Sequence, residues 1–150
     1  MREAVLAYLH LIAILTWVVF IGSSTALTRA EWLNAAALQR LALVDRLAAV
    51  GAIAVLVTGT ARVLLGVKGP GWYLEQPLLW GKFALWVAMV AGALGASRCI
   101  QRWQRASASG GGLPAAHDVA AVRRRLMAAS HLMLLAPLLA IAMARGIGVR

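Results

Sequence analysis

Four ionisable side chains stand within or at the ends of apolar stretches: His10, Arg62, Lys82 and Arg145. Such groups are costly in a membrane and usually face the interior of a helix bundle, where they mark a site. A neutral imidazole can ligate iron through one nitrogen while its other nitrogen donates a hydrogen bond. Cations beside it can neutralise the carboxylates of the same ligand. The four residues together predict a haem site.

The spacing of His10 and Trp17 places both side chains on one face of a helix, two turns apart. The same face carries Ala13, Ile14, Ile21 and Ser24. We expect His10 to be the axial ligand of the iron, Trp17 to pack against the macrocycle, and the three cations to pair with its two propionates. Two simpler interpretations stay open: a hydrogen bond from His10 to a neighbouring helix, and cationic side chains that reach back to water.

The elements that must position these residues are membrane helices. Of 150 residues, 62% are hydrophobic and 13% charged, and the mean hydropathy is +0.80, far outside the composition of soluble proteins. The apolar stretches predict an all-α integral membrane four-helix bundle with short loops, forming a single domain over residues 1–150. The helices are expected at about 5–26, 45–65, 79–97 and 126–145, with an amphipathic segment over 31–44 and a kink at Pro137 that frees the Met133 carbonyl.

The distribution of Lys and Arg predicts the orientation in the membrane. The first and third connections hold nine of them, and the two ends with the second connection hold six. The long third connection is therefore expected in the cytoplasm and both termini on the periplasmic side of a bacterial inner membrane. Because neighbouring helices run antiparallel, the four site residues would all lie in the outer half of the membrane. The cations border apolar stretches instead of forming a basic face, so no nucleic-acid partner is expected.

His131 lies in the fourth predicted helix and enters the membrane from the opposite side to His10. The two histidines would be about 15 Å apart along the membrane normal, whereas two axial nitrogens on one iron are about 4 Å apart. His131 would thus need a second haem site of its own, or a polar contact with Asp45; we favour the contact.

Several short motifs resemble an uncharacterised bacterial membrane family, domain of unknown function 2214, over nearly the whole chain. The motifs are Ala7-Tyr8-Leu9-His10, Gly59-Thr60-Ala61-Arg62-Val63, Lys68-Gly69, Trp80-Gly81-Lys82, Arg102-Trp103, and Pro137 with Met143-Ala144-Arg145-Gly146. That family is distantly similar to the membrane protoporphyrinogen oxidase, which binds haem b, and to the membrane domain of copper-resistance protein D. The resemblance implies haem b, with the oxidase's haem-ligating histidine at His10. Gly22-Ser23-Ser24-Thr25 replaces the oxidase's tyrosine, arginine and histidine cluster.

The function predicted first is that of a haem-b-binding redox membrane protein, engaged in electron transfer or an oxidase-like reaction. The first alternative is a membrane transport protein for copper or another metal, in which His10 and methionines handle the metal. The second is a cofactor-free structural or assembly subunit of a membrane complex. Expected partners are the lipid bilayer and either a second copy of the chain or a redox partner. Whether a reaction is catalysed is left open.

Overall fold

The computed structural model describes residues 1–147, and within that range it contains helices and no strand. Its elements are α1 (Arg2–Leu27), the 3-10 helix η1 (Ala30–Trp32), α2 (Ala35–Leu65), α3 (Gly69–Leu74), α4 (Pro77–Ala108), α5 (Ala116–Leu132) and α6 (Leu135–Ala144). Four helical stretches are long and apolar enough to cross a membrane: α1, α2, α4, and α5 with α6 counted as one. The all-α, four-span prediction is therefore confirmed.

The helices extend beyond their predicted apolar segments. The amphipathic segment over 31–44 is mostly the start of α2, whose first turn is capped because the Asn34 side chain accepts a hydrogen bond from the Ala37 amide at 2.8 Å. α4 continues to Ala108 instead of ending near residue 97, and α5 begins at Ala116 instead of near 126. Hydropathy locates only the part of a helix that lies in hydrocarbon, whereas backbone hydrogen bonding continues through polar residues into the interface.

The expected kink before Pro137 is present as the break between α5 and α6. Proline has no amide hydrogen, so Pro137 cannot donate to the carbonyl of Met133. The Ala136 amide donates to that carbonyl instead, at 3.2 Å, which tightens the turn. The fourth span is consequently two helical pieces, with α6 packed against α4 and α5.

α1 and α2 pack along their whole lengths as an antiparallel pair. Glu3, His10 and Trp17 are seven residues apart on α1, and each contacts α2 or the residues directly after it. A seven-residue repeat is the signature of left-handed, coiled-coil-like helix packing. Ala13, Trp17, Ile21 and Ser24 on the predicted face are buried.

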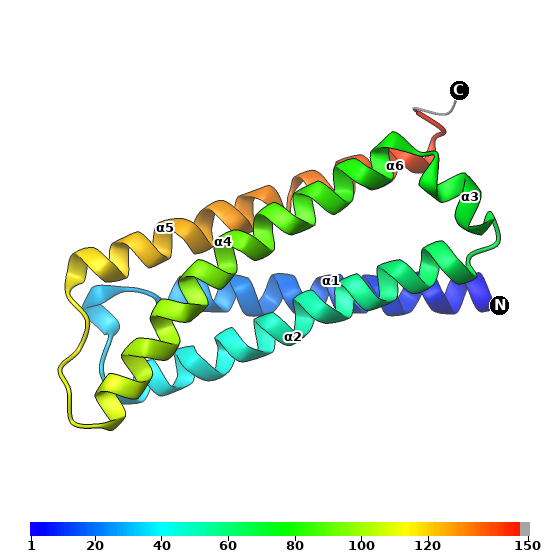
Figure 1. Cartoon of the computed structure of the whole chain (residues 1–150). Coiled ribbons are helices and arrows are strands. Elements are labelled where there is room, and N and C mark those ends of the chain that lie inside the picture. The colour runs from blue at the N-terminus through cyan, green and yellow to red at the C-terminus, as the bar shows by residue number, and fades with distance from the viewer. Residues whose placement is uncertain (148–150) are drawn as a thin grey trace.

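The core is concentrated at one end of the bundle, which we call the η1 end; the opposite end, with the N-terminus, α3 and the end of α6, is the α3 end. At the η1 end, Leu38, Leu41, Ala96, Ile100 and Leu126 are at most 1% exposed. In the described helices, nothing is buried in α1 before Ala13, in α2 after Ala52, in α4 before Met89 or in α6. The pair α1–α2 and the pair α4–α6 accordingly diverge toward the α3 end (Figure 1).

A buried polar cluster joins α2 to α4. The Asp45 carboxylate, 5% exposed, accepts hydrogen bonds from Ser97 Oγ at 2.6 Å and Gln101 Nε2 at 3.2 Å. The predicted contact between His131 and Asp45 is therefore wrong. His131 is exposed on α5, and its Nδ1 lies 2.7 Å from the carbonyl oxygen of Met127, one turn earlier in the same helix.

Candidate functional site

The first feature of the candidate site is the hydrogen bond between His10 and Thr58. His10 Nδ1 lies 2.9 Å from Thr58 Oγ1. The Thr58 hydroxyl also lies 2.6 Å from the Ala54 carbonyl, and when it donates its hydrogen there it accepts one from the imidazole. In that arrangement His10 Nδ1 carries the ring hydrogen, and Nε2 makes no hydrogen bond with the described residues.

Gly59 makes room for the imidazole on the surface of α2. A Cβ atom at this position would lie 3.2 Å from His10 Cε1, closer than ordinary van der Waals contact. The ring therefore packs against the α2 backbone itself, between the hydroxyl of Thr58 and the bare Cα of Gly59. It is half-buried there.

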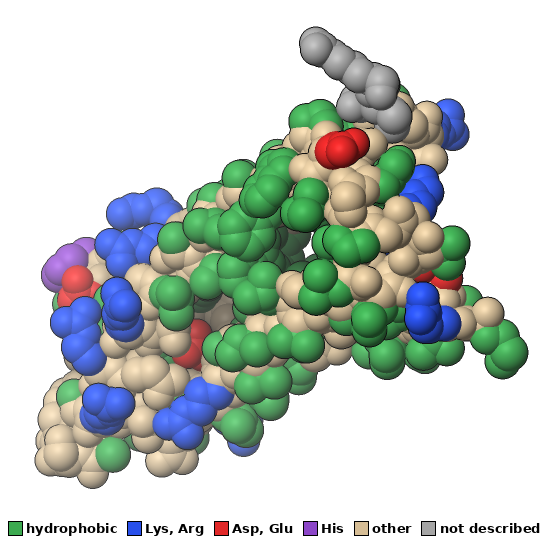
Figure 2. All heavy atoms as spheres, turned by 45° about the vertical axis from the view of Figure 1, so that its right-hand side comes forward, with side chains coloured by type: hydrophobic (Ala, Val, Ile, Leu, Met, Phe, Trp, Pro, Cys, Tyr) green, Lys and Arg blue, Asp and Glu red, His purple; other side chains and the backbone are tan. Residues whose placement is uncertain are grey.

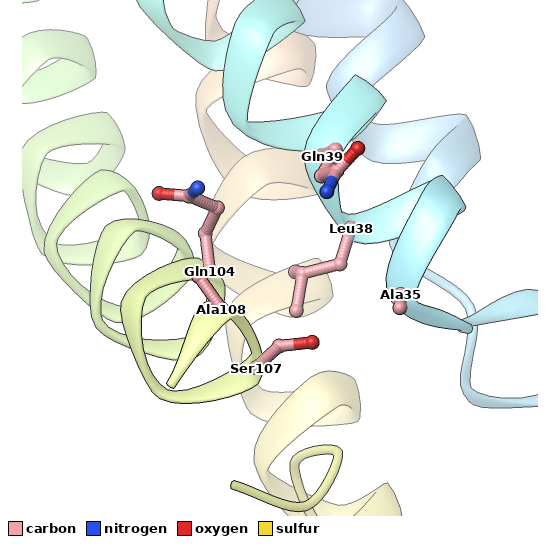
Figure 3. Close-up of a pocket in the computed structure, with 6 residues that line it drawn as sticks. All are labelled: Ala35, Leu38, Gln39, Gln104, Ser107 and Ala108. Atoms are coloured by element: carbon pink, nitrogen blue, oxygen red, sulfur yellow. The ribbon is translucent and has the colours of Figure 1, made fainter. Parts of the chain in front are cut away.

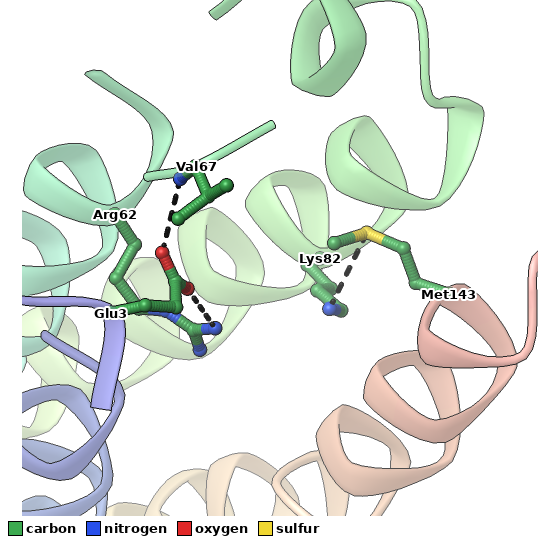
Figure 4. Close-up of polar contacts among 5 residues, drawn as sticks. All are labelled: Glu3, Arg62, Val67, Lys82 and Met143. Carbon is green, nitrogen blue, oxygen red and sulfur yellow. Dashed lines mark hydrogen bonds and ion pairs between the residues drawn. The ribbon is translucent and has the colours of Figure 1, made fainter. Parts of the chain in front are cut away.

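The second feature is an internal counter-ion for Arg62. Glu3 Oε1 lies 3.4 Å from Arg62 Nη2, and Glu3 Oε2 accepts a hydrogen bond from the Val67 amide at 3.1 Å (Figure 4). The start of α1 is thereby tied to the end of α2. The Nε atom of Arg62 is buried and has no hydrogen-bond partner, so the guanidinium is only partly satisfied.

Lys82 supplies the third feature from the other side of the opening. Its Nζ donates to the Met143 sulfur at 3.7 Å, and thioether sulfur is a weak acceptor. Among the described residues, no carboxylate lies within ion-pair distance of Lys82. Figure 4 shows Lys82 and Met143 on one side of this opening and Arg62 with Glu3 on the other side.

Three of the five predicted site residues are half-buried toward the α3 end: His10 and Arg62 where α1 meets α2, and Lys82 on α4 across the opening. Arg145 is exposed just beyond the end of α6 and makes no hydrogen bond or ion pair with the other described site residues. Trp17 is 3% exposed and belongs to the hydrophobic core. It lies two turns along α1 from His10 and packs against α2 at Gly51.

Sequence reasoning missed four residues around the site: Glu3, Thr58, Tyr73 and Met143. Tyr73 of α3 is buried, and its ring lies beside Gly66 next to the Glu3 carboxylate. One signal was available for Thr58. In two antiparallel helices, residues that are equally far from the shared end lie at the same level, which places Thr58 and Gly59 opposite His10.

One face of the bundle is apolar and hollowed. Figure 2 shows hydrophobic side chains around a recess between the two diverging arms of the bundle. Within residues 1–147, no group of three or more His, Cys, Asp or Glu side chains could hold a metal ion. His10 therefore belongs to no such group among these residues.

A small cavity at the η1 end differs from the candidate site in having no titratable side chain in its lining. Its volume of about 60 Å³ suits one or two water molecules. It lies between the start of α2 and the end of α4 (Figure 3), and it is lined by Ala35, Leu38, Gln39, Gln104, Ser107 and Ala108. None of these side chains is titratable.

Fold and site together define a multi-pass membrane protein with a cationic, histidine-containing site at the open end of a four-span bundle. The chain belongs to the family of predicted membrane proteins DUF2214, whose model matches residues 2–148. This confirms the family resemblance seen in the sequence motifs. Neither the curated proteins nor the solved structures that were compared with the chain give a match.

Proposed function

We propose that this protein binds haem b at the α3 end of the bundle, with His10 Nε2 as axial ligand, and takes part in electron transfer in the membrane. The observation that carries the proposal is the hydrogen bond of His10 to Thr58. Histidines that ligate metals almost always donate their second ring N–H to a neighbouring acceptor, which fixes the tautomer and the ring orientation. Thr58 provides that acceptor.

The charges of the site fit an anionic macrocycle. Glu3 already balances much of the charge of Arg62, whereas within residues 1–147 Lys82 has only a sulfur acceptor. The site thus keeps about one excess positive charge and an unused Arg62 N–H, and both suit propionate oxygens. Lys82 and Arg62 would hold the propionates, with Arg145 outside this set. Bound haem would supply one-electron redox chemistry, while the core around Trp17 would shield it from the η1 side.

The location proposed for this site is the outer half of a bacterial inner membrane. The η1 end carries the greater number of arginines, so the positive-inside rule places it in the cytoplasm and both termini in the periplasm. A redox partner or a second copy of the chain would then reach the site from the periplasmic side.

Replacing His10 by Ala tests the proposal. Wild-type protein, expressed with a haem supply and purified in mild detergent, is expected to show a Soret absorption band at near one haem per chain. The His10→Ala variant is expected to lose the band, because the site holds no second imidazole among the described residues. His131→Ala is the matched control, since that imidazole is exposed on α5, and it should keep the band. A wild type without the band, or an unchanged His10→Ala spectrum, would contradict haem ligation by His10.

Thr58→Val tests the role of the hydrogen bond separately from ligation. The substitution keeps the shape of the side chain but removes the acceptor for His10 Nδ1–H. Loss of such a partner typically weakens metal binding by about 10–100-fold. We expect haem titrations to show this loss for Thr58→Val and recovery in Thr58→Ser, which restores the hydroxyl. Equal affinities for Val and wild type would show that the hydrogen bond does not position the ligand.

A further inference from the structure

A second cavity, distant from His10, lies at the η1 end between η1 and the first turns of α5. Its volume is about 360 Å³. The charged residues that line it are Arg29, Glu31, Arg123 and Arg124, and Val119 and Met127 contribute apolar wall. Nothing in the proposed haem site uses these residues.

The cavity has an excess of unneutralised positive charge. Three arginines face one carboxylate, and in the described part of the chain none of the three lies within ion-pair distance of an acidic side chain. Arg123 Nε is buried without a hydrogen-bond partner, and a buried donor left unpaired costs free energy. The Arg29 guanidinium stacks on the Trp32 ring, with its Cζ atom 4.5 Å from the ring centroid. Stacking on the ring face leaves the guanidinium N–H groups free to donate hydrogen bonds to a ligand.

The position of the cavity is that of a membrane–water interface. α1 ends at Leu27, immediately before the cavity residues, and the long apolar stretch of the fourth span begins at Leu126, immediately after Arg123 and Arg124. Trp32, which favours this depth, is 57% exposed beside Arg29. Basic pockets at this level are suited to anionic lipid head groups.

We propose that this cavity binds a phosphate anion, either the head-group phosphate of an anionic phospholipid or inorganic phosphate. Arginine is suited to this ligand because its planar fork donates two parallel hydrogen bonds to phosphate oxygens. Arg123 and Arg124 would hold the phosphate, Arg29 would complete the cationic wall, and Glu31 would lie at the margin. The apolar side chains Val119 and Met127 would face the start of an acyl chain when the source is a lipid.

The test uses full-length protein in a neutral detergent and measures ligand-dependent thermal stabilisation. The probes are phosphatidylglycerol, phosphatidylcholine and sodium phosphate, each at ionic strength held constant with chloride. Arg123→Gln/Arg124→Gln is compared with Arg98→Gln/Arg102→Gln, which removes the same charge from exposed positions of α4 outside the cavity. Each charge-assisted hydrogen bond that is lost should weaken the apparent affinity about tenfold, so the Arg123/Arg124 double variant should lose about a hundredfold.

Stabilisation by phosphatidylglycerol over phosphatidylcholine, lost only in the Arg123/Arg124 variant, would support a lipid source. Stabilisation by sodium phosphate over chloride with the same dependence would support inorganic phosphate. No stabilisation by either probe, or equal loss in both double variants, would overturn the proposal. Should the Arg123/Arg124 variant fail to fold, the exposed Arg29→Gln takes its place, with several-fold weaker binding expected and unchanged binding counting against the site.

Discussion

Gly51→Leu is expected to have the largest effect on stability of any single substitution considered for this protein, because it forces α1 away from α2. A Cβ atom at residue 51 would lie 3.0 Å from the Cα and 3.2 Å from the backbone nitrogen of Trp17. A backbone cannot rotate out of the way as a flexible side chain can, so α1 itself must move. Overpacking costs about 1–3 kcal/mol of folding stability, and we expect the upper end of that range here. Replacing a helical glycine offsets about 1 kcal/mol of this loss.

The control for this substitution is Gly22→Leu on α1. A Cβ at Gly22 would meet nothing within 4 Å, so the same addition of bulk should leave the fold unchanged or slightly more stable. Thermal unfolding in detergent and the monodisperse fraction by size-exclusion chromatography measure both variants. We expect a clear drop for Gly51→Leu alone; wild-type stability for that variant would show that α1 and α2 do not approach so closely.

Gly59→Leu is expected to abolish haem binding although His10 is retained. The added Cβ would already lie 3.2 Å from His10 Cε1, and the remaining three carbons of leucine would take the space of the imidazole. The ring would be displaced from Thr58, so Nε2 would lose its position. Because the neighbour is the end of a side chain, the fold should survive better than in Gly51→Leu.

Thr60→Leu provides the matched comparison for this second prediction. Thr60 is exposed on α2 one residue beyond Gly59, so leucine there adds a large apolar side chain on a different face of the same turn. Haem-supplied Gly59→Leu should purify as a folded protein without a Soret band, while Thr60→Leu keeps the band. A folded Gly59→Leu protein with the wild-type spectrum would show that haem binding does not depend on the position of His10, and it would contradict the proposed site.

Much of the architecture is already determined by the amino-acid sequence, because its causes are local. About 20 apolar residues in a row must span the hydrocarbon as a helix, since lipid offers no partner for backbone N–H and C=O groups. The four spans and their antiparallel order follow from this, and the break before Pro137 follows from the missing amide hydrogen of proline. Equal depth in antiparallel helices also explains why His10, Arg62 and Lys82 could be predicted to lie toward the same end of the bundle.

Contacts between helices were decided only by the tertiary structure, because helix rotation and helix ends are not encoded in hydropathy. Rotation of α5 turns His131 away from Asp45, and the α2–α4 contact gives that carboxylate to Ser97 and Gln101 instead. Arg145 lies beyond the end of α6, where an exposed guanidinium costs little. The pairing of Glu3 with Arg62 and the hydrogen bond between Thr58 and His10 both depend on one register of α1 against α2. That register is set by the close approach at Gly51 and Gly59, a matter of three-dimensional packing.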